Sequence, residues 1–452
     1  MGRLGILAGI VGIAFASADA LSQSAQTATI YEGARLIVGD ASAPIDNGAF
    51  VVQNGRIIAI GRKGSVNAPA GAAHVDLTGK TVMPTLINAH VHIGYEGYTT
   101  WGAQNYTPAN VLDHLRREAF YGIGVTQSVG SSPTDPSIQF KKDQEAGKFS
   151  TASRFMFMPG MAPPHGGPDA ILMKGTDALH AVYEVSTPQE ARAAVQSMAA
   201  KQLKSVKIWV DDRRGTYPKM TPDVYNAIIA EAHAHQMMVN AHAIALPDQK
   251  AVVSAGVDVL VHTVGNEKLD AEYVGIVKSK KPYWTTVIGL GDRSEVCNHD
   301  SFVDQTYPAK ALDAIRAESC APRPENAQRE EILSYNVKQM VASGARLVLG
   351  TDAGIAARHA FGWADHHEIA RWVELGVTPQ EAIIAATSRP AELLGLKDLG
   401  TLANGKSASF VVLNANPLEN IKNMRQIDSV YLAGAKLDRQ GMLKEFTKAS
   451  TN

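Results

Sequence analysis

Residues 206–241 hold the pattern that decides the fold. The apolar run Val206-Lys207-Ile208-Trp209-Val210 is followed by a helical stretch that begins at Thr221-Pro222-Asp223, and then by a second apolar run, Met237-Met238-Val239-Asn240-Ala241. A threonine directly before a proline is a typical helix start. Short apolar runs that alternate with helices predict buried parallel strands. We therefore predict a strand–helix–strand unit of an α/β protein here.

The same alternation continues in both directions along the chain. Further strands are predicted at 81–83, 124–126, 154–157, 257–261, 283–287 and 346–349, and further helices at 187–201, 326–343 and 378–394. Eight strands is the number that closes a (β/α)8 TIM barrel. A doubly wound sheet is the alternative, but it should carry a glycine-rich phosphate loop after its first strand, and the sequence has none. We predict a TIM barrel over residues 84–395.

Both ends of the chain are instead rich in short strands. Apolar runs occur at 34–38, 48–52 and 56–60, and Asn54-Gly55 between the last two is a hairpin signal. Similar runs return at 408–413 and 429–433. We predict that residues 27–83 and 396–440 pair into one small β-sandwich domain.

The first 26 residues are predicted to be a signal peptide. Arg3 precedes an apolar run from Leu4 to Ala16, and Ala16-Ser17-Ala18 and Ala18-Asp19-Ala20 both fit the cleavage rule. The run is shorter than the roughly 20 residues that a permanent span needs. An uncleaved anchor or a buried helix is the alternative. We expect a secreted or periplasmic protein with no permanent membrane span.

The composition restricts the partners. The chain has 452 residues, with 45% hydrophobic residues, 19% charged residues and a formal net charge of −1. Nucleic acid and anionic membranes need a clustered positive field, which the sequence does not offer. A small-molecule substrate is therefore expected. The two cysteines, Cys297 and Cys320, are predicted to form a disulfide after export, within a long connection at 289–325 that is a candidate lid.

Six residues with chemical function lie within or directly after the predicted strands. They are His90, His92, Lys207, His242, His262 and Asp352. Each alone has an ordinary structural explanation, but a barrel gathers the carboxyl ends of its strands at one face. Alternate residues of a strand point the same way, so His90 and His92 can chelate one ion. Neutral imidazoles and a carboxylate suit Zn²⁺ or a similar divalent metal.

Lys207 distinguishes a site with two metals from a site with one. An ammonium group beside two dications would be repelled, whereas a neutral amine can add carbon dioxide and become an anionic carbamate that bridges them. The carbamate, the Asp352 carboxylate and one hydroxide leave a single positive charge on two dications. That residual charge suits the stabilisation of an oxyanion.

With these residues in place, the chain resembles the amidohydrolase superfamily, specifically its binuclear members with a carboxylated lysine. The nearest likeness is to the branch with imidazolonepropionase-like proteins, secreted Xaa-Pro and Xaa-Arg dipeptidases and ochratoxin-degrading amidases. It extends from about Thr29 to Leu437. The resemblance implies two divalent ions, a homo-oligomer and a general acid/base role for Asp352. It also implies the ligand set: His90, His92 and Asp352 for the first ion, His242 and His262 for the second, and carboxylated Lys207 between them.

The chain departs from the family pattern just before the His pair. The family usually reads Pro-Gly-Leu-Ile-Asp, whereas this chain reads Pro84-Thr85-Leu86-Ile87-Asn88. Neither Thr85 nor Asn88 is an expected ligand. The substitutions are therefore expected to affect the local turn and leave the metal site in place.

The predicted reaction is hydrolysis of an amide or peptide bond in an N-acyl amino acid or a dipeptide-like molecule. A metal-bridging hydroxide attacks the carbonyl, and Asp352 passes the proton to the leaving nitrogen. The alternatives are a mononuclear deaminase or imidazolone-type cyclic amide hydrolase, which needs no carbamate, and an esterase or lactonase. A non-enzymatic relative that has lost its ligands is disfavoured, because all six positions are filled.

Candidate substrate contacts lie on two loops. His165 is in the Pro/Gly-rich loop at 161–168, and Arg213, Arg214 and Tyr217 follow the strand at 206–210. A guanidinium group can hold a substrate carboxylate with two hydrogen bonds. A rigid surface loop and a salt-bridged turn are the respective alternatives. Further candidates are Tyr106, His359 and Trp363.

Overall fold

The computed structural model describes most of the chain. The described residues are 2, 28–98, 100–167, 179, 181–292, 294–320, 327–356 and 359–448. The signal peptide predicted at 1–26 lies outside them, apart from Gly2. Among the described residues, no helix combines the length and the apolar character that a membrane span requires.

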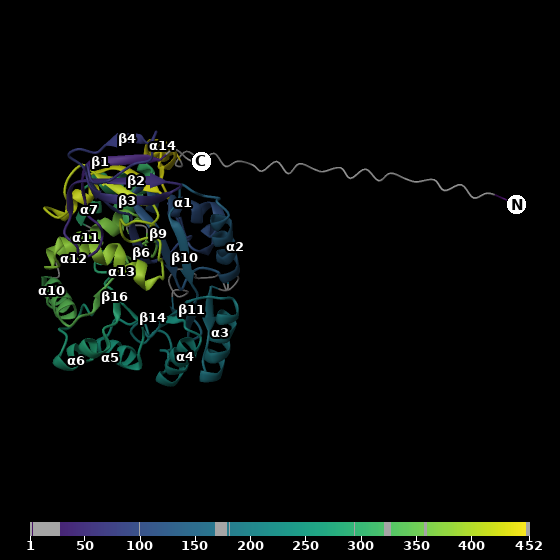
Figure 1. Ribbon diagram of the computed structural model, residues 1–452. Coiled ribbons are helices and arrows are strands. Elements are labelled where there is room, and N and C mark those ends of the chain that lie inside the picture. Colours follow the sequence, from purple (N-terminus) through teal and green to yellow (C-terminus); the bar gives the residue numbers. More distant parts are fainter. Residues whose placement is uncertain are drawn as a thin grey trace.

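The centre of the molecule is the predicted (β/α)8 TIM barrel (Figure 1). All pairings between its neighbouring strands are parallel. The strands are β6(Leu86–Val91), β9(Ile123–Val129), β10(Arg154–Met158) with β11(Gly160–Ala162), β13(Ser205–Trp209), β14(Met238–His242), β15(Val259–Val261), β16(Tyr283–Thr285) and β17(Arg346–Leu347). β12(Val182–Glu184) adds to the edge of β11. The last and first strands meet where the amide of Ala89 donates to the carbonyl of Leu349 over 2.8 Å.

Helices follow the strands around the barrel. The larger ones are α1(Pro108–Phe120), α2(Thr134–Glu145), α3(Pro188–Ala200), α4(Pro222–Ala234), α5(Leu246–Ala255), α6(Ala271–Lys280), α10(Ala327–Ala342), α11(Trp363–Glu374), α12(Pro379–Ala386) and α13(Ser388–Leu393). The starts predicted from Thr-Pro at α3, α4 and α12 are confirmed. The helix predicted at 378–394 is split at Thr387. The Thr387 hydroxyl bonds to the carbonyl of Ile383, and Pro390 has no amide hydrogen to continue the helix.

The run at 81–83, which was counted among the eight alternating strands, is not a barrel strand. Residues 81–83 lie in β5(Thr81–Pro84), which pairs with strands from the two chain ends, and the first barrel strand is β6. Only Thr85 separates β5 from β6, so the chain passes directly from one sheet into the other. The prediction failed because a short apolar run does not show which sheet receives it.

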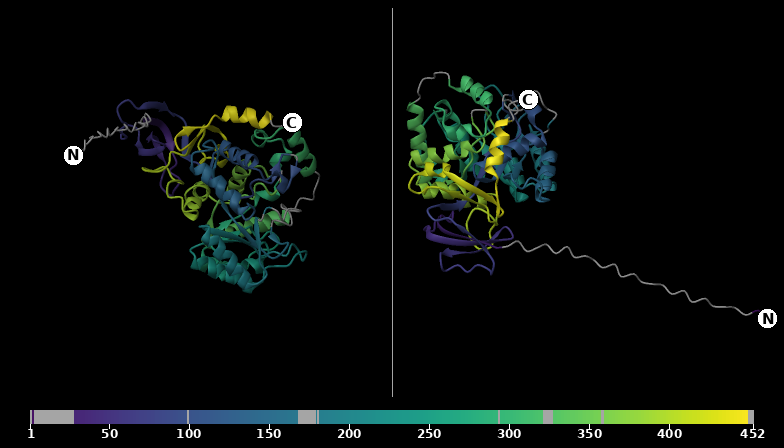
Figure 2. Two further views of the ribbon diagram at one scale, coloured as in Figure 1. Left: turned by 90° about the vertical axis from the view of Figure 1, so that its right-hand side faces the viewer. Right: turned by 90° about the horizontal axis from the view of Figure 1, so that it is seen from above.

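The two chain ends form one mixed sheet (Figures 1 and 2). Its other strands are β1(Thr29–Leu36), β2(Ile45–Gln53), β3(Arg56–Arg62), β4(Ala73–Asp76), β18(Phe410–Leu413), β19(Ile427–Leu432) and β20(Ala435–Lys436). The rings of Phe50 on β2 and Phe410 on β18 are 5.0 Å apart. Their strands are three positions apart in the sheet, about 14 Å if it were flat. The sheet therefore curls, and its two halves face each other across an aromatic core.

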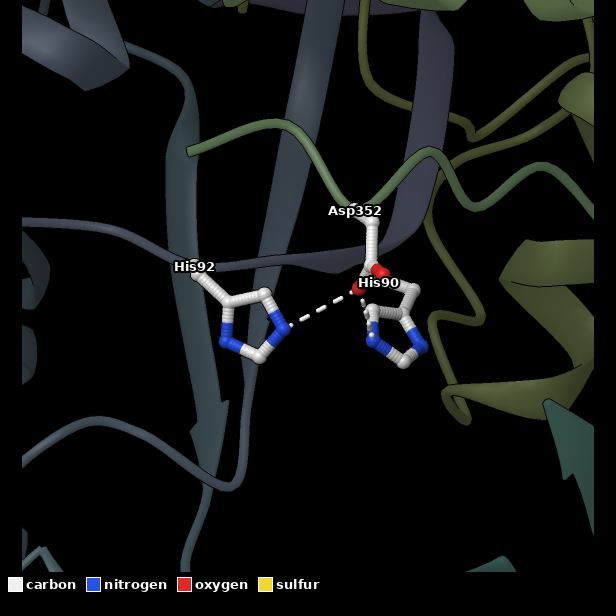
Figure 3. A group of neighbouring side chains, drawn as sticks. All are labelled: His90, His92 and Asp352. Carbon is white, nitrogen blue, oxygen red and sulfur yellow. Dashed lines mark hydrogen bonds and ion pairs between the residues drawn. The ribbon is translucent and has the colours of Figure 1, made fainter. Parts of the chain in front are cut away.

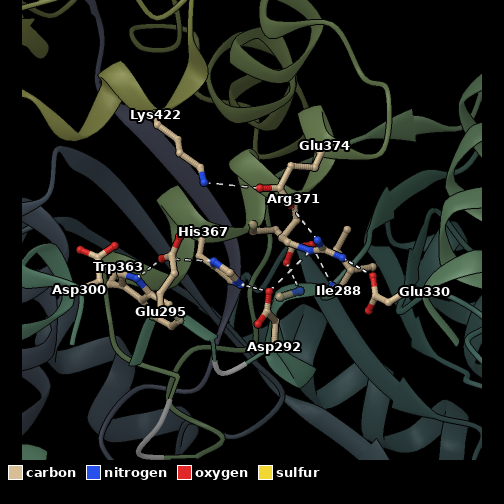
Figure 4. A network of polar contacts seen from close by, with 12 residues as sticks. Ile288, Asp292, Glu295, Asp300, Glu330, Trp363, His367, Arg371, Glu374 and Lys422 are labelled. Carbon is tan, nitrogen blue, oxygen red and sulfur yellow. Dashed lines mark hydrogen bonds and ion pairs between the residues drawn. The ribbon is translucent and has the colours of Figure 1, made fainter. Parts of the chain in front are cut away.

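The connection after β16 is tied to the barrel. It contains η4(Gly289–Gly291), α7(Ser294–Cys297), α8(Ser301–Asp304) and α9(Ala309–Ser319), and the predicted Cys297–Cys320 disulfide is confirmed. Figure 4 shows a charged network between this connection and α11. His367 lies 3.4 Å from carboxylate oxygens of both Asp292 and Glu295. Although burial opposes it, these carboxylates raise the pKa of His367 to about 9. The lid role of this connection stays a prediction.

Candidate active site

Three of the predicted ligands converge at the barrel mouth (Figure 3). The Nε2 atoms of His90 and His92 lie 2.8 Å and 3.0 Å from the same Asp352 oxygen, Oδ1. One ligand atom of each residue lies within 4.8 Å of the others, and all three side chains are buried. We call this group the first half-site. It is the arrangement that a divalent ion needs from two imidazoles and a carboxylate.

Closure of the barrel builds the first half-site. His90 is the last residue but one of β6, and Asp352 lies in the segment after β17. The Asp352 amide donates to the His90 carbonyl over 3.0 Å, and the His92 amide donates to the Ala353 carbonyl over 2.7 Å. A Cβ at Gly350 would lie 2.7 Å from the Cβ of His90, so only glycine permits this approach. The backbone therefore fixes the three donors.

Neighbouring side chains orient the donors further. The His92 Nδ1 atom lies 2.8 Å from the Ser131 hydroxyl. Asn88 accepts a hydrogen bond from the His90 amide and donates one to the Thr351 hydroxyl, both over 2.9 Å. An amide side chain can do both. Asn88, where the chain departs from the family pattern, therefore joins β6 to the segment after β17. The second departure, Thr85, is buried against Gly124, where a Cβ would lie 2.8 Å from the Cβ of Thr85.

The protonation states suit metal binding. Burial and the positive charge of Lys207 lower the pKa of His90 to about 3, against the opposing influence of Asp352. Burial would raise the pKa of Asp352, but His90 and His92 hold it well below its usual range. At neutral pH the half-site therefore presents an uncharged His90 imidazole and an ionised Asp352 carboxylate.

Lys207 lies in β13 and is only 1% exposed. Burial and Arg213 lower the pKa of its ammonium group to about 7, although Asp352 acts in the opposite direction. Its Nζ atom lies 5.6 Å from the centre of the Trp209 ring, and no described residue accepts a hydrogen bond from it. A Cβ at Gly130 would lie 2.8 Å from the Cγ of Lys207, so a glycine directly after β9 makes room for the lysine stem.

His242 and His262, which were predicted to bind a second ion, lie next to each other, and we call them together with Lys207 the second half-site. Their rings are 4.4 Å apart, and the ring of His262 is 6.2 Å from that of His90. However, the Nε2 atom of His242 faces an Asp211 oxygen at 3.0 Å and an Arg213 nitrogen at 3.3 Å. Among the described residues, only the first half-site forms a convergent group of three metal-binding side chains.

Asp211 is a site residue that the sequence reasoning missed. It is buried and accepts hydrogen bonds from the backbone and side chain of Arg213 over 2.9 Å and 2.7 Å. Burial would raise the pKa of Asp211, but His242 and Arg213 hold it below its usual range. Its position directly after β13 was the available signal, because carboxyl ends of barrel strands carry site residues.

The predicted substrate contacts separate into three places. Arg214 lines a cleft of about 840 Å³ that also reaches His262. Arg213 instead bonds to Asp211 and to the carbonyl of Gly167 over 3.1 Å. His165 and Tyr217 line a different pocket of about 580 Å³. The four residues therefore do not meet around one substrate position.

The sequence pattern of the amidohydrolase family matches residues 175–434, which is more than half of the chain. The chain belongs to the amidohydrolase family. It is a hydrolase that acts on carbon–nitrogen bonds, as predicted. The matched range contains Lys207, His242, His262 and Asp352, and the His90/His92 pair lies before it.

This amidohydrolase is similar to proteins of several kinds, as three relatives show by their identity and coverage. It is 36% identical over 104 residues to an imidazolonepropionase of Deinococcus radiodurans, covering 22% of this chain and 26% of that one. It is 23% identical over 446 residues to an ochratoxinase of Aspergillus niger, covering 91% and 86%. A crystal structure of a Xaa-Pro dipeptidase with bound methionine superposes with a TM-score of 0.72 at 23% identity, covering 91% and 99%. The last likeness supports the fold.

Proposed function

We propose that this amidohydrolase uses two divalent metal ions to cleave the amide or peptide bond of an N-acyl amino acid or a dipeptide-like molecule. The observation that carries the proposal is a buried lysine amine beside a convergent His–His–Asp group. Lys207 lies in the strand that faces the first half-site, without a hydrogen-bond acceptor among the described residues. A buried amine in such a place needs a chemical partner.

The donor set fits this proposal. His90, His92 and Asp352 would hold the first ion, most naturally Zn²⁺. Lys207, N-carboxylated by carbon dioxide, would bridge to a second ion that His242 and His262 also bind. When bound, the ions would supply a water of lowered pKa and a polarised scissile carbonyl.

Asp352 is proposed to move the proton. Its Oδ1 atom lies 2.8 Å and 3.0 Å from the Nε2 atoms of His90 and His92, where the first ion would be held, which leaves Oδ2 for a water or a leaving group. A carboxylate held in its ionised form can accept the proton of the attacking water and deliver it to the departing nitrogen. Ser131 and Asn88 keep the histidines in place while this happens.

A second function is supported by a specific observation. The first half-site is the convergent one, and it alone would serve a mononuclear deaminase or a cyclic amide hydrolase. The partial likeness to an imidazolonepropionase agrees with that chemistry. The content of bound metal separates the two proposals, with two ions per chain for the first and one for the second. An esterase or lactonase would use the same activated water.

Hydrolysis of a substrate panel by the Zn²⁺-loaded protein tests the proposal. The panel contains N-acyl amino acids, Xaa-Pro and Xaa-Arg dipeptides, aryl amides and lactones, each with the wild type and with Lys207→Ala. We expect amide cleavage that falls at least a hundredfold in the variant, an effect of the size of a lost catalytic group. Partial rescue by a short-chain carboxylic acid should follow, because the acid can replace the carbamate. Full activity in Lys207→Ala would refute the bridging carbamate.

We further propose that the chain is exported to the periplasm or beyond and assembles as a homo-oligomer. The disulfide between Cys297 and Cys320 supports export, because such bonds persist in oxidising compartments. Mass spectrometry of the mature N-terminus tests cleavage after residue 26 or earlier. Light scattering tests the assembly, and a monomer would contradict it.

A further inference from the structure

The 840 Å³ cleft beside His262 offers a place for the substrate beyond the reacting bond. Its walls come from the segments after β13, β14, β15 and β16 and from the first turns of α10. These segments all leave the face of the barrel on which the half-sites lie. The volume falls in the range of roughly 300–1,000 Å³ that is usual for pockets that bind small molecules. We call this space the Arg214 cleft.

One wall of the Arg214 cleft is apolar. It is formed by Ile244, Val287, Ile288, Leu290, Ile332 and Leu333. Ile244 is 43% exposed, which is unusual for a large aliphatic side chain in this protein. A substrate side chain that covered Ile244 would remove apolar surface from water, which contributes about 25 cal/mol per Å². The wall therefore favours a ligand with an apolar group.

Arg214 is a cation of the cleft that has no counter-ion among the described residues. Asp211 is paired with Arg213 at 2.7 Å, and Lys219 is paired with Asp248 at 2.8 Å and with Asp212 at 3.8 Å. These pairs account for the three carboxylates that line the cleft. Arg214 is exposed and has no carboxylate partner among the described residues. A ligand with a negative charge would balance the guanidinium group.

The backbone holds Arg214 in a strained turn. Arg213, Arg214 and Gly215 have φ angles of 50°, 61° and 79°, all in the left-handed region. Such a conformation disfavours a non-glycine residue, because its Cβ comes too close to the following carbonyl oxygen. The side chain of Arg213, anchored on Asp211 and the Gly167 carbonyl, keeps the turn in place. Strain of this kind gathers at ligand-binding sites.

We propose that Arg214 selects substrates that carry a free carboxylate next to an apolar side chain. An N-acylated apolar amino acid and a dipeptide with an apolar C-terminal residue both have this structure. The proposal rests on the proposed hydrolase function and narrows its substrate class. Arg214 would act as a specificity residue that contacts the substrate away from the reacting carbonyl, whereas Arg213 stays with Asp211 and His242.

Matched pairs of acid and amide ligands test this role. The metal-loaded wild type, Arg214→Ala and Arg62→Ala are compared on N-acetyl-L-leucine and N-acetyl-L-leucinamide. Both binding by calorimetry and hydrolysis are measured. Arg62 is an exposed arginine on β3, distant from the barrel mouth, and serves as the matched control.

We expect the wild type to prefer the acid. Arg214→Ala should weaken binding of the acid and raise its KM at least tenfold, with kcat within about a factor of two and no change for the amide. Arg62→Ala should match the wild type. Equal preference for acid and amide in the wild type, or an unchanged preference in Arg214→Ala, would overturn the inference and leave the hydrolase in place. Binding that depends on Arg214 without any hydrolysis would support the inference and count against the proposed function.

Discussion

The two half-sites of this barrel are built in different ways. In the first, backbone hydrogen bonds join β6 to the segment after β17. They place one ligand atom each of His90, His92 and Asp352 within 4.8 Å of the others. In the second, side chains decide the arrangement. Asp211 and Arg213 hold His242 at 3.0 Å and 3.3 Å.

The two half-sites therefore depend on different parts of the structure, the first on the backbone and the second on neighbouring charged side chains. The first is fixed by the closure of the fold. The second depends on a balance of charges among Asp211, Arg213 and Lys207, and an ion or a carbamate would change that balance. We therefore expect the first half-site to bind its ion more tightly, and the second to respond more strongly to substitutions of its neighbours.

The largest expected effect comes from Asp352, which is both a member of the first half-site and the proposed proton carrier. Asp352→Asn removes the proton acceptor while keeping the shape of the side chain, so kcat should fall by about 10²–10⁴-fold with a smaller change in KM. Steady-state kinetics on the best panel substrate measure it. Asp313→Asn, an exposed change on α9, should leave kcat unchanged. If Asp352→Asn keeps more than a tenth of the wild-type kcat, the role of Asp352 is disproved.

An intermediate effect is expected from Asp211→Asn. Loss of this carboxylate releases His242 and Arg213, so affinity for the second ion should fall by about 10–100-fold while the first ion stays bound. Titration with a chelator, with the metal content counted at each step, measures both affinities. Equal weakening of the two ions would show that the half-sites are not built separately.

The smallest expected effect is a change of thermal stability with pH. It comes from two buried carboxyl groups near the first half-site. Glu118 and Asp365 are fully buried there and interact with each other. Burial raises the pKa of Asp365 to about 8, and burial with Asp365 raises that of Glu118. The folded state thus keeps protons that the unfolded chain releases near pH 4.

The stability from this carboxyl pair is therefore fully present below about pH 4 and is lost as the pH rises through about 8. The Tm of the wild type should fall by a few degrees between pH 6 and 9. Glu118→Gln should make this fall shallower, because an amide donates a hydrogen bond to Asp365 and removes one acid. Thermal unfolding across this range measures the slopes, with the exposed Glu145→Gln as control. Parallel curves for Glu118→Gln and the wild type would rule out this role.

Much of the fold could be predicted because its pattern is local. Alternating strands and helices indicated the barrel, and Thr-Pro pairs marked the starts of α3, α4 and α12. Two cysteines leave one intrachain pairing. The assignment of 81–83 failed, because an apolar run of three residues carries no information about its partner strands. That information lies in long-range contacts with β1 and β18.

For the site, the sequence predicts which residues lie at the ends of the barrel strands. It does not predict how side chains on the following turns are directed. Position in a barrel gathers His90, His92 and Asp352 whatever the intervening sequence. Side-chain direction on an irregular turn follows no period, so the sequence did not separate Arg213, which turns inward to Asp211, from Arg214 in the cleft. The contacts of Asp211 with Arg213 and His242 could not be predicted either, because Asp211 lies on the same irregular segment.

Metal content per chain tests the central claim most directly. The wild type and Lys207→Ala are loaded with Zn²⁺, desalted and analysed for zinc and protein. The account predicts two ions per chain in the wild type and one in Lys207→Ala, with the first half-site still filled. One ion per chain in the wild type, or two in Lys207→Ala, would contradict it.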